Sequence, residues 1–180
     1  MPEARIVSTA RSELSPWVTL VSRVIERGAG PQTYHSLAQS DYVSVLAVAA
    51  DGRIPLVRQF RPAVERITLE LPGGLLDSNE PPEAVAAREL EEETGLRADG
   101  APVLLGKLLP DTGRLENRFW GYFVRAREMP AWRPEPGVER LLVTRGELRR
   151  AILDGSFDHA LHIALVGLAL MQGHFSWDPA

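Results

Sequence analysis

One stretch of this sequence, Gly74 to Leu96, constrains the chain more than any other. It reads GLLDSNEPPEAVAARELEEETGL, with a glycine near each end. Between the two glycines, Glu80 and Arg88 precede an acidic run over residues 89–93. Glycines, carboxylates and an arginine at fixed spacing around one helical segment are typical of a site for a metal ion and phosphate. The stretch therefore predicts such a site.

A helix over this segment would gather three of its glutamates on one face. At about 100° per residue, Glu89, Glu92 and Glu93 fall within roughly a 100° arc, and the opposite stripe is apolar. Carboxylates so close repel one another, and a divalent cation would relieve this repulsion. Oxygen ligands favour magnesium, with manganese as an alternative. Arg88 precedes Glu92 by one turn and can brace its carboxylate, or it forms an ordinary surface ion pair.

Composition limits the class of protein. A chain of 180 residues with 44% hydrophobic content can bury one sizeable core, which predicts a single compact domain. It contains no cysteine, so any metal ligands are oxygen or imidazole, and a cytoplasmic location is expected. The formal net charge of −4 predicts a small-molecule partner rather than nucleic acid.

Neither end of the chain predicts export or a membrane span. The N-terminal residues lack the continuous apolar stretch of a secretory signal. Ala160 to Met171 is almost wholly apolar, but a bilayer requires about 20 helical residues. We expect a buried terminal helix there, beginning at Ser156 or Asp158.

Hydrophobic patterning predicts strands on both sides of the acidic segment. A hairpin is expected from two N-terminal segments, and Met129 to Gly137 is expected to be a loop because it is rich in proline. Asn79 is expected to cap the acidic helix and Gly95 to close it. Thr144 has capping-box spacing with Glu147 ahead of another helix. The expected strands are Trp17–Glu26, Thr33–Leu37, Val43–Ala49, Ile54–Phe60, Ile67–Leu71, Val103–Leu108 and Arg118–Ala126.

The pattern from Gly74 to Leu96 is similar to the box of the Nudix hydrolases, and all of its specified positions are filled. This resemblance implies the α/β fold of that family, an α/β/α sandwich with a mixed central sheet and an N-terminal β-hairpin extension. Residues 1–40 would form the hairpin region and residues 41–180 the Nudix domain. It also implies that water cleaves a pyrophosphate bond with the help of a divalent metal ion. By the same analogy, the metal ligands are Glu89, Glu92, Glu93 and the carbonyl of Gly73.

Two further motifs resemble the ADP-ribose pyrophosphatase branch of that family. They are Leu56–Pro62, LVRQFRP, and Leu69–Leu75, LELPGGL. The resemblance implies that Arg61 binds phosphate and that Glu70 lies near the metal ions. A guanidinium suits this role because it can hold phosphate oxygens in bidentate fashion. A purely structural role for both residues is the alternative.

The branch also binds adenine between two aromatic residues, which Trp17 and Tyr34 match by position. Core aromatics of a hairpin are the alternative reading. The resemblance implies a homodimer that exchanges this hairpin, so that two subunits share the adenine site.

Two regions depart from the pattern of the branch. Pro110 lies close to a marker proline, but the following Asp-Thr-Gly differs from the usual proline-glycine turn. The catalytic base of the branch is a glutamate on a mobile loop. Glu139, Glu135 and Glu116 are the candidates for it here.

His159 and His162 are three residues apart and could suggest a metal pair. We interpret them instead as a helix-end and a core or surface histidine, because Asp158 is the only carboxylate beside them in the sequence. The resemblance as a whole implies a magnesium-dependent enzyme that hydrolyses ADP-ribose to AMP and ribose 5-phosphate. The alternatives are a GDP-mannose or UDP-sugar pyrophosphatase and, in another class, a noncatalytic nucleotide-sugar sensor.

Overall fold

The computed structural model describes residues 4–28, 30–77, 79–134 and 136–178, which divide into two units. The first unit comprises the described residues of Met1–Asp41 together with Leu109–Arg118. The second comprises those of Tyr42–Leu108 and Phe119–Ala180. The first unit therefore contains, besides the N-terminal region expected over residues 1–40, the distant segment Leu109–Arg118.

The first unit is a three-stranded antiparallel sheet in the order β1-β2-β3. Its strands are β1 (Arg5–Ser15), β2 (Val18–Glu26) and β3 (Pro31–Ala38). β2 and β3 are the predicted hairpin, whereas β1 was not predicted. Nearly all of β1 is exposed, so its sequence lacks the alternation of buried and polar residues that marks a strand. The distant segment joins this unit through hydrogen bonds of the Leu37 backbone to Arg114 and Glu116.

The second unit contains eight strands and three helices among its described residues. The strands are β4 (Tyr42–Ala49), β5 (Ile54–Arg61), β6 (Arg66–Glu70), β7 (Gly73–Leu75), β8 (Leu96–Ala98), β9 (Val103–Leu108), β10 (Phe119–Glu128) and β11 (Val138–Val143). The helices are α1 (Pro82–Thr94), α2 (Arg145–Asp154) and α3 (Ala160–Met171). One sheet has the order β7-β4-β10-β8, with β9 also paired to β10, and the other has the order β11-β5-β6. β4 and β10 are parallel and their other neighbours antiparallel, which confirms the mixed sheet.

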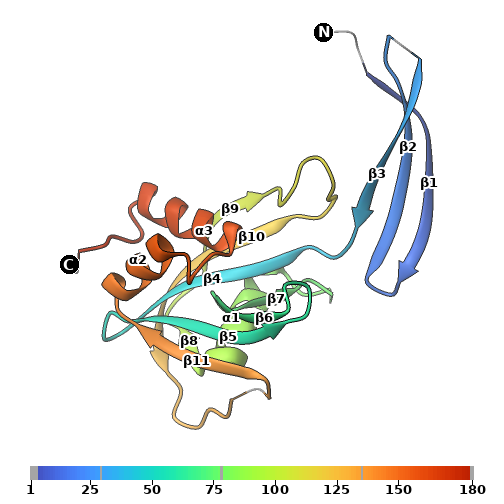
Figure 1. Cartoon of the computed structure of the whole chain (residues 1–180). Coiled ribbons are helices and arrows are strands. Elements are labelled where there is room, and N and C mark those ends of the chain that lie inside the picture. The colour runs from blue at the N-terminus through green and yellow to red at the C-terminus, as the bar shows by residue number, and fades with distance from the viewer. Residues whose placement is uncertain (1–3, 29, 78, 135, 179–180) are drawn as a thin grey trace. The chain divides into compact units, whose positions relative to one another are not determined.

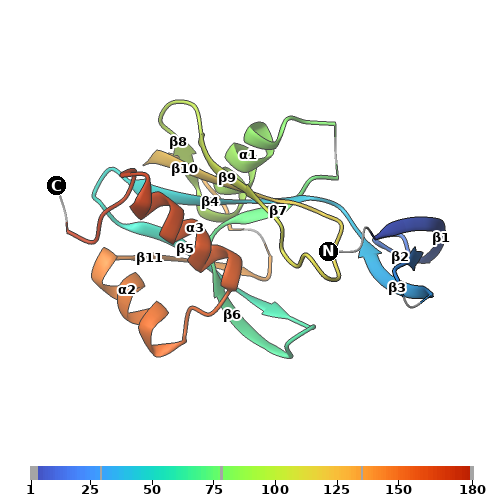
Figure 2. The ribbon, with the colours of Figure 1, turned by 90° about the horizontal axis from the view of Figure 1, so that it is seen from above.

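The central strand β4 shows how the helices cover both faces of the larger sheet. Val43 and Val45 belong to one apolar cluster with residues of α1, whereas Leu46 and Val48 belong to another with residues of α3. Because successive side chains of a strand point to opposite faces, the continuous apolar run is buried on both sides. Figures 1 and 2 show α1 on one face and α2 and α3 on the other.

The acidic helix α1 ends where expected but begins later. Gly95 follows it in the left-handed conformation, with φ of 66°, and its N–H bonds the carbonyl of Glu91. The predicted cap, Asn79, is wrong: Pro81 occupies the N-cap and makes no side-chain cap. The reason is Pro82 at the first helical position, which forces the preceding residue to be extended.

Helices α2 and α3 both begin with side-chain caps. The predicted capping box of Thr144 and Glu147 is present at α2. α3 begins after His159, whose side chain accepts from the His162 N–H, and not at Ser156 or Asp158. Histidine is not among the usual capping residues, so this cap could not be predicted from residue type. In the described part of the chain, no helix has the length and apolar character needed to cross a membrane.

Candidate active site

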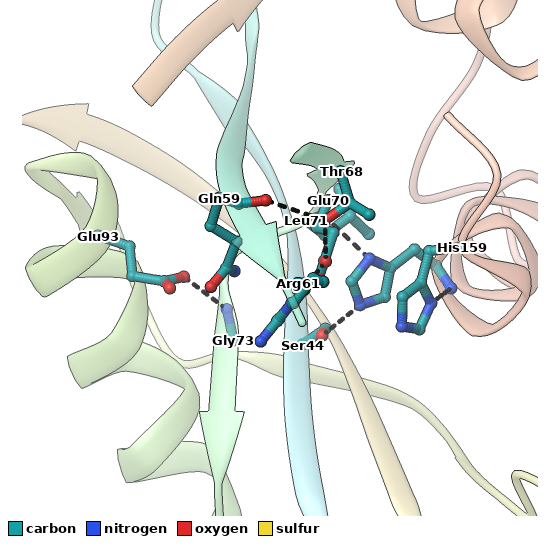
Figure 3. A network of polar contacts seen from close by, with 10 residues as sticks. Ser44, Gln59, Arg61, Thr68, Glu70, Leu71, Gly73, Glu93 and His159 are labelled. Carbon is teal, nitrogen blue, oxygen red and sulfur yellow. Dashed lines mark hydrogen bonds and ion pairs between the residues drawn. The ribbon is translucent and has the colours of Figure 1, made fainter. Parts of the chain in front are cut away.

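The turn between β6 and β7 meets helix α1 at two consecutive glycines. The Gly73 N–H donates to Oε2 of Glu93 at 2.9 Å (Figure 3). A Cβ on Gly74 would lie 2.5 Å from the carboxyl carbon of Glu89, so only glycine lets this carboxylate pack against the backbone. Glu93 is buried, with 5% of its surface exposed. Glu89 and Glu93, which are four residues apart on α1, therefore contact the adjacent glycines of the β6–β7 turn.

Arg88 binds the carboxylates that flank it on the helix. Its guanidinium lies 2.9 Å from Glu89, 2.7 Å from Glu92 and 3.4 Å from Glu80. The ion pair with Glu92, which both interpretations of Arg88 expect, is thus accompanied by two further ion pairs. Since Arg88 and Glu92 are both partly exposed, each pair contributes little to stability by itself. Their arrangement nevertheless offsets repulsion within the acidic face.

The donor atoms around this turn fit a hard divalent cation. Glu89, Glu92 and Glu93 present only oxygen, and the space beside Gly74 is filled by a carboxylate instead of a side chain of the turn. Magnesium and manganese prefer such ligands. The residues predicted to bind metal are therefore compatible with it by donor chemistry.

Arg61 and Glu70 form a bidentate ion pair at the ends of β5 and β6. Arg61 donates from Nε at 2.8 Å and from Nη2 at 2.7 Å, and the Thr68 hydroxyl adds a bond of 2.6 Å. Burial by itself would raise the pKa of Glu70. The hydrogen bonds from Arg61 and Thr68, together with the charge of Arg61, outweigh burial and lower the pKa to about 2. Glu70 is consequently a carboxylate that holds Arg61 in place.

His162, which no sequence pattern placed near the turn, connects α3 to it. Its Nδ1 accepts the Leu71 N–H at 3.1 Å, and its Nε2 lies 2.9 Å from the Ser44 hydroxyl. Since Nδ1 is an acceptor, Nε2 carries the proton and donates to Ser44. Burial, followed by the neighbouring His159, lowers the pKa of His162 to about 3. The residue is a neutral hydrogen-bonding link between β4, the turn and α3.

Glu70 comes close to both histidines, contrary to the expectation that Asp158 is the only carboxylate near them. One ligand atom from each of Glu70, His159 and His162 lies within 4.8 Å of the others. Both nitrogens of His162 are already hydrogen-bonded, and both oxygens of Glu70 bind Arg61. His162 and Glu70 are therefore already engaged in a hydrogen-bonding network.

The candidate catalytic bases lie in different parts of the chain. Glu139 pairs with Arg58 at 3.1 Å and points away from its neighbour Arg140, whose guanidinium contacts α1 at the Thr94 carbonyl. Glu116 belongs to the first unit. Burial raises its pKa, but bonds from Ser36 and Arg23 and the charge of Arg11 lower it overall. The third candidate, Glu135, lies outside the described residues.

The candidate base-stacking residues, Trp17 and Tyr34, belong to the first unit. Trp17 is 70% exposed and immediately precedes β2, whereas Tyr34 pairs with Arg23 on that strand. Trp17 and Arg23, the residue opposite Tyr34, are six residues apart, which corresponds to about 20 Å along an extended strand. One chain therefore does not bring the two rings together on a single base. Tyr34 instead lines a hollow of 680 Å³ with Arg23 and residues of the 109–118 segment.

Two residues outside the acidic helix cap its C-terminal end. Trp132 donates its indole N–H to the carbonyl of Glu92 at 2.9 Å, and Arg140 donates to that of Thr94 at 2.7 Å. The Arg140 guanidinium lies 4.8 Å from the centre of the Trp132 ring. Sequence reasoning missed both residues, although it placed Trp132 in a proline-rich loop. The cap connects that loop to the helix of the candidate metal ligands.

Comparisons with known proteins show the family of this chain. Residues 39–160 match the NUDIX domain. An ADP-ribose pyrophosphatase of Mycobacterium tuberculosis is 33% identical over 143 residues, which are 76% of this chain and 68% of that protein. One from Bacillus subtilis is 54% identical over 56 residues, which are 31% of this chain and only 30% of that protein.

A solved structure described as an ADP compounds hydrolase resembles the fold over 96% of both chains. The TM-score is 0.79 and the sequence identity 20%. This likeness confirms the predicted fold class. Since the domain match covers more than half of the sequence and the mycobacterial relative aligns over most of it, the chain belongs to the Nudix family, in its ADP-ribose pyrophosphatase-like branch.

Proposed function

We propose that this protein hydrolyses the pyrophosphate bond of ADP-ribose and releases AMP and ribose 5-phosphate. The observation that carries the proposal is the seating of Glu89 and Glu93 on the Gly73–Gly74 turn. The relatives described as ADP-ribose pyrophosphatases support the choice of substrate. Glu93, Glu89, Glu92 and the Gly73 carbonyl would hold magnesium.

Each group of the second unit has a distinct task in this proposal. A bound divalent ion would neutralise the diphosphate and make water more acidic. Arg61 uses Nε and Nη2 to bind Glu70, so its remaining N–H groups are oriented for phosphate oxygens. Arg88 keeps the acidic side chains together before substrate arrives. A glutamate would take a proton from the attacking water.

Among the candidates for that glutamate, two have structural arguments against them. Glu116 forms ion pairs with Arg11 and Arg23 of the first unit. Glu139 points to the face of β11 opposite the one that contacts α1. We therefore propose that Glu135 be tested first. Glutamine substitutions at the three positions, compared by kcat, identify the base.

The adenine base would be held by aromatic residues of the first unit. The separation of Trp17 and Tyr34 along one chain supports a site that takes its second ring from another copy. The homodimer and the cytoplasmic location remain predictions. Light scattering tests the dimer directly, and Trp17→Ala should raise KM for ADP-ribose if the ring stacks on adenine.

The proposed activity is tested with a substrate panel. ADP-ribose, GDP-mannose, UDP-glucose and a dinucleotide are incubated with magnesium or with chelator, and phosphate is measured after treatment with phosphatase. The expected result is magnesium-dependent turnover with preference for ADP-ribose. Preference for GDP-mannose or UDP-glucose would contradict the substrate assignment and favour the corresponding sugar pyrophosphatase. If no compound is hydrolysed, the proposed activity is wrong and a noncatalytic sensor is favoured.

A further inference from the structure

The side chain of His159 has one hydrogen-bonding group to spare. As the N-cap of α3, it accepts the His162 N–H at its Nδ1, at 3.4 Å. A neutral imidazole has one protonated nitrogen, so this bond leaves the proton on Nε2. Nε2 makes no hydrogen bond within the described residues. His159 therefore presents an N–H donor on the side of the ring away from its own helix.

The orientation of this donor is fixed by His162. The two imidazole rings are stacked, with centroids 3.7 Å apart and an angle of 14° between their planes. His162 is itself held by Leu71 and Ser44. The His159 ring thus stacks on a neighbour that is hydrogen-bonded at both nitrogens, and it is capped to its helix, which reduces the entropy lost when it binds a ligand.

His159 lines a cavity that is also lined by Arg61 and Glu70. The cavity has a volume of 130 Å³ and is bounded by the glycine turn of the candidate metal site. Glu70 uses its oxygens to bind Arg61 and Thr68. Arg61 has only N–H donors and His159 carries its proton on Nε2, so the hydrogen-bonding groups left over on these two residues are donors. A ligand that satisfies them must supply acceptor oxygens.

We propose that His159 Nε2 and Arg61 together bind an oxygen of the substrate diphosphate. This inference rests on the proposed pyrophosphatase activity and adds a binding residue to it. It assigns His159 a direct contact with substrate, whereas His162 positions it. A phosphoryl oxygen fits because it accepts several hydrogen bonds and carries charge.

The electrostatics of the cavity favour a neutral imidazole in this role. Burial is the largest effect and lowers the pKa of His159; the charges of Glu70 and Asp158 raise it and that of Arg61 lowers it, and the net direction is downward. The residue is therefore uncharged at neutral pH. It can donate to phosphate without adding a second buried cation beside Arg61.

Two substitutions isolate the donor from the structural roles of His159. His159→Asn retains an oxygen that can cap α3 but loses the ring. His159→Phe retains a ring for stacking but loses the cap. Both remove the Nε2 donor. His174→Asn is the matched control, because His174 stacks on Phe123 and lies outside the cavity.

Two measurements are made on the full chain. The first is kcat/KM for ADP-ribose, which we expect to fall by about 10-fold or more in both His159 variants and not in the control. The second is calorimetric binding of inorganic pyrophosphate with magnesium, which should weaken by a similar factor. Thermal unfolding shows whether the loss of binding and activity follows a loss of stability. Stability should differ between the two His159 variants, because one retains the cap and the other retains the ring.

The outcomes separate this inference from the proposed function. Equal binding of pyrophosphate by all four proteins, or a loss confined to one His159 variant, would overturn the role of the donor. If the wild type hydrolyses no nucleotide sugar, the proposed function fails. The pyrophosphate comparison then still decides whether His159 binds phosphate oxygens.

Discussion

His162 accepts the backbone N–H of Leu71 and donates to the hydroxyl of Ser44, and thereby connects helix α3 both to strand β4 and to the turn between β6 and β7 that contains the two glycines. Ser44 also pairs with Gly73 in the ladder between β4 and β7. The position of Gly73 relative to Glu93 consequently depends on an imidazole just beyond the residues that match the NUDIX domain. Two substitutions of His162 test this dependence.

His162→Leu should destabilise the protein by about 2 to 4 kcal/mol, because it leaves the buried Leu71 N–H without an acceptor and loses the bond to Ser44. His162→Gln can supply an acceptor and a donor, so it should lose less. Urea denaturation gives both values. In active enzyme, the leucine variant should also require more magnesium for half-maximal activity. The link to the turn is contradicted if both variants have the magnesium requirement of the wild type.

Acid should destabilise the protein through the same residue. His162 has a pKa of about 3 in the folded chain, against an ordinary value of 6.5, so below pH 6.5 protons bind the unfolded chain preferentially. Its contribution is complete above pH 6.5 and is lost as pH falls toward 3, with a slope of at most about 1.4 kcal/mol per pH unit. Glu70, with a pKa of about 2 against 4.5, adds a loss of the same sign below pH 4.5.

The His162→Gln variant separates these two contributions. Its free energy of unfolding should be less dependent on pH than that of the wild type between pH 6.5 and 4.5, where Glu70 does not yet contribute. Urea denaturation at pH 7, 6 and 5 provides the comparison. Parallel pH profiles of the two proteins would show that His162 is not buried in its neutral form.

A third prediction concerns Gly95, which closes the acidic helix. Its φ of 66° disfavours any side chain, and a Cβ there would lie 2.4 Å from the Trp132 ring. Gly95→Ala should therefore destabilise the protein by about 2 to 3 kcal/mol. Gly146→Ala is the control, because no atom lies within 4 Å of its added Cβ, and the change should be below about 1 kcal/mol.

The double substitution Gly95→Ala with Trp132→Ala tests the contact itself. If the overlap with the indole is part of the cost, the two effects on unfolding free energy are not additive. Additive effects would mean that only the backbone conformation of Gly95 matters.

Local sequence patterns predicted those parts of the fold that local physics decides. The apolar run of β4, the capping box at Thr144 and the glycine cap at Gly95 all follow from neighbouring residues. β1 escaped prediction because its side chains are exposed and only its pairing with β2 orders it. Non-local pairing leaves no local signal in such a strand.

The acidic helix of the candidate site was predictable from local spacing, whereas the contacts that His162 and Trp132 make with the site from distant parts of the chain were not. The spacing of Glu89 and Glu93 places both on one helical face, and the structure seats them on the glycine turn. His162 is separated from Leu71 by 91 residues, so no spacing rule connects them. Trp132 likewise caps α1 from a loop whose proline content predicted only irregular backbone.

The charge of Glu93 should matter more than its hydrogen bond. In Glu93→Gln, an amide oxygen can still accept the Gly73 N–H, so the turn is retained while the negative charge is lost. We expect kcat/KM for ADP-ribose to fall at least about 100-fold, with a shifted magnesium dependence and little change in thermal stability. Glu91→Gln is the control on the same helix, because Glu91 pairs with Arg97 at the surface, and it should stay within about twofold of the wild type. Unaltered turnover in Glu93→Gln would remove this residue from the metal site. Equal losses in both variants would mean that the net charge of the helix, rather than the position of Glu93 at Gly73, controls activity.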